Sequence, residues 1–361
     1  MADQSSRTTL RYALVLCLLA FALVIALTLS RTRLRAASAP GANPAANPLT
    51  VSETRSMLST DLTLTVVAES EPQARAAIAA GFERIAELDA IMSAHRPDSE
   101  LARLNARAGR EPVKVSDELY RAIEAGVVWN SRTDGAFDIA CAPLLDLWRS
   151  CSKLDRLPTP DELARVKSLG GAARILLDPK VHTVRFPVDG MRLDLGGHGK
   201  GFIADEVEKV FLKRGVRNAL IALSGDIRAM GQTAEGRPWR VGVQDPRKPE
   251  AIITTLELTD RSVSTSGASE RFVVIQGKRH SHIADPRTGQ TAEGISSDTV
   301  IGPDTTTTDV LDTGLNVLGV KDGLALVEKL GNVEAIFVTY NEKGEMRLTR
   351  SKGFAAYEVK K

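Results

Sequence analysis

The sequence predicts an α+β fold, and the order of its local patterns is the main reason. Short β-prone runs and amphipathic helical runs are intermixed along the chain, without the strict strand–helix–strand rhythm of a doubly wound parallel sheet. A hydrophobic content of 43% and a charged content of 25% are those of a globular protein with a sizeable core. The 361 residues suffice for one large domain or two ordinary ones, and no internal repeat is evident.

Composition also excludes some classes of protein. A formal net charge of +2 and an aromatic content of 4% argue against a dedicated nucleic-acid-binding protein, which would show a basic excess and stacking residues. Three cysteines are too few for a disulfide scaffold or a cysteine-built zinc site. Cys17 lies in an apolar run, so only Cys141 and Cys151 could pair, and the pattern favours two buried free thiols.

The N-terminal part predicts a membrane segment. Tyr12–Leu29 carries no charged residue and comes close to the length that spans a hydrocarbon core. We expect residues 1–35 to be an uncleaved anchor. A cleaved signal peptide is the alternative, because Ala37–Ala39 has a small-x-small form, although the proline that follows disfavours cleavage. Arginines flank the apolar run on both sides and leave its orientation open.

Two further segments follow the anchor. Residues 36–50 are rich in alanine, proline and asparagine and predict a flexible linker, and residues 51–361 predict the functional domain. Hydrophobic periodicity and capping residues predict helices at Pro72–His95, Ser116–Ser131, Pro158–Val166, Ala204–Lys213, Asp309–Gly319 and Lys321–Leu330. Alternation predicts strands at Leu62–Val67, Arg174–Leu177, Thr183–Phe186, Asn218–Leu223, Trp239–Val243, Ile252–Leu258, Ser262–Ser264 and Phe272–Ile275, and a closing hairpin of Ala335–Tyr340 and Met346–Thr349. The apolar run Pro143–Trp148 is left open between strand and helix.

A glycine-rich turn is the feature around which the domain is organised. An extended run delivers Asp194 to a turn with three glycines in six residues, and a helix follows. Such a turn lets backbone N–H groups approach an oxyanion, and Lys200 would add a cation to that cradle. Its glycine spacing is neither that of a P-loop nor that of a dinucleotide-binding fingerprint. A plain tight turn is the alternative.

A second group of polar residues shares one face of a predicted helix. Asp309, Asp312 and Thr313 are three and four residues apart, so their oxygens point the same way. Two carboxylates and a hydroxyl suit a hard cation such as Mg²⁺, which commonly bridges to phosphates. The alternative is that the two aspartates merely favour the positive end of the helix dipole.

Two histidines precede a turn that contains proline. His280 and His282 would point the same way from a strand, but no third nitrogen or sulfur ligand is apparent, which disfavours zinc. His282 is therefore a candidate general base, or else a structural histidine. Ser264–Gly267 is a hydroxyl-rich turn of the kind usually found in loops.

Taken together, the motifs resemble those of the ApbE-type FAD:protein FMN transferases. Six blocks carry the resemblance, in order: Met92–Glu100, Asp134–Asp138, Asp194–Gly201, Ser264–Gly267, His282–Gly289 and Asp309–Leu315. It covers about residues 50–345. The resemblance implies an ApbE-like flavin transferase domain of mixed sheets and helices, behind the N-terminal transmembrane anchor.

The resemblance also implies site residues. By motif position, the FAD site would be lined by Met57, His95, Ala136, Phe137, Asp138, Asp194, Lys200 and Ala284. Mg²⁺ would be held by Gly197, through its backbone carbonyl, with Asp309, Asp312 and Thr313. His95 stands where an aromatic residue often stacks on the flavin, Leu58 replaces a usual glycine, and His198 is unusual in the glycine-rich turn.

The implied reaction is a Mg²⁺-dependent transfer of FMN from FAD to a Ser or Thr of a target flavoprotein, with release of AMP. We expect His282 and Lys200 to take part in catalysis, and the target to be a subunit of a membrane redox complex. The domain would face the periplasm from the cytoplasmic (inner) membrane. The alternatives are a Mg²⁺-dependent FAD pyrophosphatase and a non-catalytic periplasmic flavin-binding protein.

Overall fold

The computed structural model describes residues 48–107, 109–267 and 272–360, within a compact unit that begins at Pro48. The expected anchor and most of the expected linker lie outside these residues. The first strand, β1, begins at Leu49, so residues 49 and 50 belong to the sheet rather than to the tether. Within the described ranges, no helix has both the length and the apolar character needed to cross a membrane.

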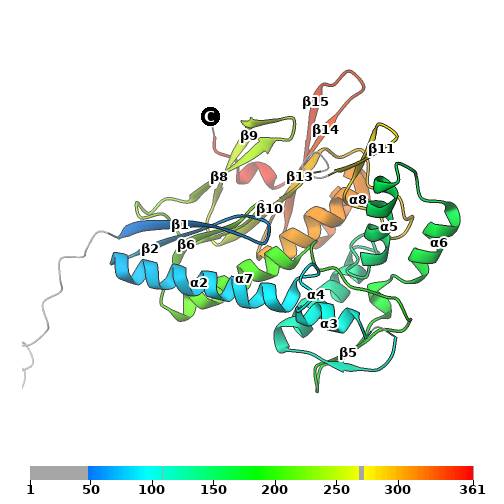
Figure 1. Cartoon of the computed structure of the whole chain (residues 1–361). Helices are drawn as coiled ribbons and strands as arrows, with labels where there is room; N and C mark the ends of the chain where they lie inside the picture. Colours follow the sequence, from blue (N-terminus) through cyan, green and yellow to red (C-terminus); the bar gives the residue numbers. More distant parts are fainter. Residues whose placement is uncertain (1–47, 108, 268–271, 361) are drawn as a thin grey trace, which may run out of the picture. The chain divides into compact units, whose positions relative to one another are not determined.

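The domain is built on an eight-stranded antiparallel sheet (Figure 1). Its spatial order is β1-β2-β6-β7-β10-β13-β14-β15. The strands are β1 Leu49–Met57, β2 Thr60–Ala68, β6 Asn218–Leu223, β7 Asp226–Met230, β10 Arg261–Ser266, β13 Ser297–Gly302, β14 Glu334–Tyr340 and β15 Met346–Arg350. Smaller sheets pair β8 (Trp239–Asp245) with β9 (Lys248–Leu258), β11 (Phe272–Ile275) with β12 (Lys278–Ser281), and β5 (Thr183–Arg185) with β3 (Val113–Lys114) and β4 (Leu176–Asp178).

Seven helices are described: α2 Glu71–Met92, α3 Glu100–Asn105, α4 Asp117–Arg132, α5 Ala142–Lys153, α6 Pro160–Ser168, α7 Gly199–Lys213 and α8 Thr305–Leu330. Four of them, α3, α4, α6 and α8, begin at a residue whose side chain caps the helix. The Ser116 side chain accepts from Leu119 N at α4, and a full capping box of Thr159 and Glu162 opens α6. Gly319 interrupts α8 with a positive φ, so α8 is two helical segments. The mixed α+β prediction is confirmed.

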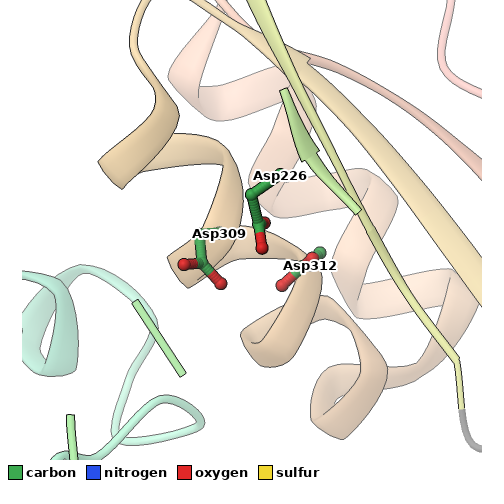
Figure 2. Close-up of side chains that lie close together, drawn as sticks. All are labelled: Asp226, Asp309 and Asp312. Atoms are coloured by element: carbon green, nitrogen blue, oxygen red, sulfur yellow. The ribbon is translucent and has the colours of Figure 1, made fainter. Parts of the chain in front are cut away.

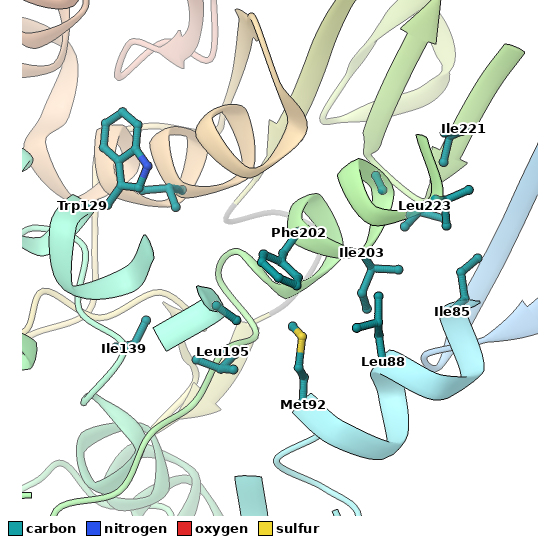
Figure 3. Close-up of a cluster of buried hydrophobic side chains, with 14 of the residues drawn as sticks. Ile85, Leu88, Met92, Trp129, Ile139, Leu195, Phe202, Ile203, Ile221 and Leu223 are labelled. Carbon is teal, nitrogen blue, oxygen red and sulfur yellow. The ribbon is translucent and has the colours of Figure 1, made fainter. Parts of the chain in front are cut away.

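Helices α2, α7 and α8 cover one face of the sheet, and their apolar faces form the larger core with it (Figure 3). Leu88 of α2, Ile203 of α7 and Ile221 of β6 are all buried in this core. Each such side chain stabilises the fold by about 1.5–3 kcal/mol relative to an exposed one. On the other face, Trp239 and Leu256 of the β8–β9 hairpin pack in a second core. The central strands are thus buried on both faces.

Hydroxyl pairs fix α8 against the sheet. Ser262 Oγ lies 2.9 Å from Thr305 Oγ1, and Ser264 Oγ lies 2.8 Å from Thr308 Oγ1, and all four side chains are buried. These pairs satisfy polar groups that would otherwise be costly inside the core. They also correct one expectation, because Ser264–Ser266 belong to strand β10 and not to a loop.

Most expected helices and strands are confirmed, some with identical bounds, as for β6 and β11. The open case Pro143–Trp148 lies in helix α5. Six of the described helices and strands had no expectation: β1, α3, β3, β7, β12 and β13. One helix bound differs in a way that matters, because α8 begins at Thr305 rather than at Asp309.

Candidate active site

A cavity of about 870 Å³ opens between the helices and the loops at one end of the sheet. It is bounded by the loop after α2, the segment before α5, the glycine-rich turn at the start of α7, the face of α8 that bears Asp309, Asp312 and Thr313, and the segment after β12. Residues far apart in the sequence therefore line one cavity.

Nearly all expected site residues line this cavity. The lining residues among them are His95, Ala136, Phe137, Asp138, Asp194, Gly197, Lys200, His282, Ala284, Asp309, Asp312 and Thr313. Met57 is the exception. It ends β1 and packs against the larger core, while its neighbour Leu58 lines the cavity. The structure thus brings together residues from all the sequence motifs.

Three carboxylates meet at one side of the cavity. Asp309 and Asp312 come from α8, and Asp226 comes from the first position of β7 (Figure 2). One oxygen from each lies within 4.8 Å of the others. We call Asp226, Asp309 and Asp312 the acidic cluster. Thr313 extends it, since its Oγ1 donates to Asp312 Oδ1 at 3.3 Å.

The helix-dipole alternative for Asp309 and Asp312 loses its basis. Because α8 begins at Thr305 and is capped by Asp304, Asp309 is the fifth residue of the helix and Asp312 the eighth. The dipole effect falls off within the first turn. The helix dipole therefore does not explain why aspartates occupy positions 309 and 312.

Three backbone amides of the glycine-rich turn, which was expected to cradle an anion, donate to acceptors within the protein. The Gly196 N–H donates to Asp194 Oδ1 at 2.8 Å, and the Gly201 N–H donates to Asp309 Oδ2 at 2.7 Å. The Gly199 N–H donates to Leu195 O at 2.7 Å. The amides of Gly196 and Gly201 therefore orient the carboxylates of Asp194 and Asp309.

Gly201 also sets how closely α7 approaches α8. A Cβ at this position would lie 2.3 Å from Thr305 O and 2.8 Å from Asp309 Cβ. Only glycine fits there without moving a helix. Gly197 lies close to the same site, since a Cβ on it would lie 3.5 Å from Thr313 Oγ1.

Lys200 pairs with the acidic cluster. Its Nζ donates to Asp226 Oδ2, and burial, which lowers the lysine pKa, is outweighed by the nearby carboxylates, which raise it. Burial and mutual repulsion raise the pKa values of Asp309 and Asp312 well above the ordinary carboxyl range. One ammonium group thus faces three buried carboxylates.

Two further aspartates act on the backbone of the site. Asp138 is buried, and its carboxylate accepts from the N–H groups of Ala140, Gly171 and Ala172 at 2.7–3.1 Å. Burial raises the pKa of Asp138, and the three amides oppose that rise. Asp138 therefore holds the segments behind the cavity wall together. Asp194 has a comparable role within the glycine-rich turn.

The two histidines expected to point the same way occupy different environments. β12 ends at Ser281, so His282 follows the strand and is exposed at the cavity. His280 is buried, with its ring 5.3 Å from that of Trp148, and burial lowers its pKa. Of these two histidines, only His282 lines the cavity.

His198 is a structural residue of the turn. It is fully buried, its Nε2–H donates to Ala122 O at 2.9 Å, and its ring meets Phe137 edge-on at 5.6 Å. Burial lowers its pKa to about 4, so the ring is neutral at physiological pH. It anchors the turn to α4.

Sequence reasoning missed Asp226. The residue follows a two-residue turn, Ser224-Gly225, that joins β6 to β7, and Ser224 has a positive φ. A short alternating run after Ser-Gly would have indicated the strand. Nothing local indicates that this aspartate meets α8, because an aspartate beside a tight turn is common.

The donor set fits a hard divalent cation. Three carboxylates and one threonine hydroxyl offer oxygen ligands alone, which is what Mg²⁺ prefers. Asp226 Oδ1 is buried and has no hydrogen-bond partner among the described residues. A cation would satisfy this oxygen and offset the charge that one lysine leaves unbalanced.

Comparisons with known proteins find relatives in sequence and in fold. The model of the ApbE family matches residues 58–337. An FAD:protein FMN transferase of Treponema pallidum is 34% identical over 284 residues, which cover 74% of this chain and 78% of the relative. One from Klebsiella pneumoniae is 33% identical and covers 72% and 81%. The crystal structure of the ApbE protein from Thermotoga maritima superposes with a TM-score of 0.77 at 30% identity, covering 86% of this chain and all of that one. The flavin transferase ApbE from Vibrio cholerae gives 0.76 at 25% identity, covering 86% and 99%.

Proposed function

The chain belongs to the ApbE family, and from this premise we propose that it is an FAD:protein FMN transferase. The observation that carries the proposal is the position of Lys200, Asp309 and Asp312 on one wall of a cavity of about 870 Å³. That volume lies toward the upper end of the range for small-molecule sites, about 300–1,000 Å³, as a dinucleotide requires. A diphosphate beside this wall would have a cation-binding face next to it.

The reaction needs a hydroxyl nucleophile, a diphosphate and a place for the displaced charge. A Ser or Thr oxygen of the target attacks the phosphorus on the FMN side of FAD, the P–O bond to the AMP phosphate breaks, and AMP leaves with the bridging oxygen. The hydroxyl proton passes to a base. Mg²⁺, held by Asp309, Asp312 and Thr313, would neutralise charge on the diphosphate. Gly197 would complete this set through its carbonyl, as the family resemblance implies.

The decisive experiment uses the purified full-length protein with FAD, Mg²⁺ and a candidate target flavoprotein. Flavin fluorescence on the target in a denaturing gel is the expected result. Free FMN and AMP without labelled target would instead identify a pyrophosphatase, since water can replace the protein hydroxyl. Unchanged FAD would identify a binding protein. Either of these outcomes contradicts the proposal.

His282 is the base in this proposal. It is exposed at the cavity directly after β12, and histidine titrates near physiological pH. His282→Ala should lower the transfer rate by about 10²–10⁴-fold with little change in FAD affinity. His280→Ala is the matched control two residues away. It should lose thermal stability through its contact with Trp148 and keep the rate. Full activity of a folded His282→Ala protein would contradict the role.

We also propose that the domain acts at a membrane, facing the periplasm. The support is the uncharged run Tyr12–Leu29 in the sequence, and the target we propose is a subunit of a membrane redox complex. Alkaline phosphatase fused after Lys361 should be active. An inactive fusion, with an active cytoplasmic reporter at the same position, would contradict this orientation.

A further inference from the structure

Asp226 differs from the other two members of the acidic cluster in where it comes from. Asp309 and Asp312 line the cavity from α8, whereas Asp226 starts β7 and is not among the lining residues. Only 1% of its surface is exposed. Figure 2 shows the three side chains converging from the helix and the strand. Asp226 therefore approaches the cluster from the sheet, behind the cavity wall.

The two oxygens of Asp226 have different surroundings. Oδ2 accepts from Lys200 Nζ. Oδ1 is buried and has no hydrogen-bond partner within the described part of the chain. Most buried carboxylate oxygens find a partner, and one that does not is costly to the fold. The unpartnered oxygen lies in a cluster of groups that offer only oxygen ligands.

We propose that Asp226 bridges a divalent cation and Lys200, with Oδ1 as a third carboxylate ligand of the cation and Oδ2 as the partner of the lysine. The proposal rests on the Mg²⁺ dependence proposed above and adds to it a residue from a different element. In this arrangement the unpartnered Oδ1 binds the cation, and the ion pair between Oδ2 and Lys200 is unchanged.

The spacing is compatible with one ion. Mg²⁺ binds oxygens at about 2.0–2.1 Å in an octahedron, so two ligand oxygens lie about 3 Å apart when adjacent and about 4.2 Å apart when opposite. One oxygen from each of the three carboxylates lies within 4.8 Å of the others. Closure of the three carboxylates around a central cation would bring their oxygens into this range.

The bridge explains why a lysine stands among the acids. Lys200 and Asp309 both line the cavity, and Asp226 lies behind them. A shared carboxylate would hold the ammonium group and the cation at a fixed separation on one wall. Two positive charges at a set distance can meet two phosphates of one diphosphate, which a flexible lysine alone would do less well.

The test measures Mn²⁺ binding to the full-length protein by electron paramagnetic resonance, without FAD and without turnover. Asp226→Asn should weaken Mn²⁺ binding by at least about tenfold. Asp298→Asn is the matched control, because Asp298 is also fully buried and also has one unpartnered oxygen, yet lies outside the cluster. It should change Mn²⁺ affinity by less than about threefold. Equal affinity of Asp226→Asn and wild type would overturn the inference.

A double variant guards against a folding defect and against a role as mere counter-ion. Asp226→Asn leaves Lys200 without its charged partner, whereas Asp226→Asn with Lys200→Met removes both charges. Lys200→Met alone should bind Mn²⁺ at least as tightly as wild type, because a nearby positive charge is gone. Adding Asp226→Asn to it should again cost at least about tenfold. No further loss in the double variant would mean that Asp226 serves only the lysine.

These outcomes separate this inference from the proposed function. Wild-type Mn²⁺ binding with no effect of Asp226→Asn overturns the bridge and leaves the metal site of α8 standing. A wild-type protein that transfers FMN with a chelator present and binds no Mn²⁺ overturns both the bridge and the metal site, while the transferase function stands. Thermal melts followed by circular dichroism establish that each variant is folded at the temperature of the binding experiment.

Discussion

Helix α7 contributes to two charge clusters with opposite balance. Near its start, Lys200 is the cation that, among the described residues, lies beside Asp226, Asp309 and Asp312. Six residues later, Glu206 is the one buried anion, and it accepts from Arg84, Arg121 and Lys209 at 2.7–2.8 Å. We call this second group the Glu206 cluster.

The difference in charge balance indicates that the Glu206 cluster stabilises the fold, whereas the acidic cluster is suited to bind a cation. In the Glu206 cluster, burial opposes ionisation, but the hydrogen bonds from Arg121, Lys209 and Arg84 outweigh it and lower the glutamate pKa to about 2. In the acidic cluster, burial and repulsion raise the pKa values of Asp309 and Asp312. The first cluster gains from being charged, whereas the second is strained until a cation balances it.

The largest expected effect is on catalysis, from Asp309→Asn. Transfer should fall by about 10²–10³-fold or more, because the diphosphate charge would be less well neutralised. Stability should hold or rise, since one of several repelling buried carboxylates is removed and asparagine can still accept from the Gly201 N–H. The rate of target labelling at saturating FAD and a thermal melt measure the two quantities. Unchanged transfer at low Mg²⁺ would contradict the metal assignment.

Glu206→Gln should give the reverse pattern. Losing a buried partner of several cations should cost about 3 kcal/mol and lower the melting temperature by roughly 5–10 °C. Transfer measured well below that temperature should stay within about twofold. Glu71→Gln is the control, because the Glu71–Arg75 pair is exposed and should contribute under about 0.5 kcal/mol. Equal losses in both variants would mean that burial of the Glu206 cluster does not matter.

Gly201→Ala should lower both the stability of the domain and its Mn²⁺ affinity, because Gly201 lies at the contact between α7 and α8 beside Asp309. The added Cβ would meet Thr305 O and should destabilise the domain by about 1–3 kcal/mol while displacing Asp309. Gly199→Ala is the control in the same turn, where a Cβ would lie 3.5 Å from Met92 Cε, an ordinary contact. Calorimetry and Mn²⁺ titration measure the two effects. A Gly201→Ala protein that matches wild type in both would show that the helices can separate freely.

Local signals predicted much of this arrangement. The periodicity of α2 and the serine cap of α4 were sufficient, because those helices are amphipathic and bury one face. The shared face of Asp309, Asp312 and Thr313 followed from helical spacing alone. The features that could be predicted are those that depend on the sequence of a single helix or strand.

The rest depends on contacts between elements. The start of α8 was missed because Thr305–Thr308 are β-branched and poor helix formers, yet Asp304 caps them and β10 pairs with two of their hydroxyls. Gly201 looked like part of an anion cradle, but its role is set by where α8 passes. Asp226 reaches the cluster only through the order of strands in the sheet.

The smallest expected effect is in the acid dependence of stability, measured with a chelator present. Asp309 and Asp312 have raised pKa values in the folded protein. Between about pH 4 and neutrality the folded protein therefore binds more protons than the unfolded chain. The stability of the folded protein falls as pH rises through that window. Glu206 has a lowered folded pKa of about 2, so its contribution is present above about pH 4.5 and is lost as pH falls toward 2.

The metal-free protein should therefore become more stable from pH 7.5 to about 5, by about 1 kcal/mol or 2–4 °C, and then less stable below about pH 4.5. Asp309→Asn should flatten the first part, and Glu206→Gln should weaken the second. The raised pKa of Asp298 acts in the same direction as the acidic cluster, so the difference between wild type and Asp309→Asn isolates the cluster's share. Saturating Mg²⁺ should remove that difference, because the cation takes over the role of the protons. A wild-type profile that keeps its full slope with Mg²⁺ bound would mean that these carboxylates do not hold the ion, and the contrast between the two ends of α7 would then be one of burial alone.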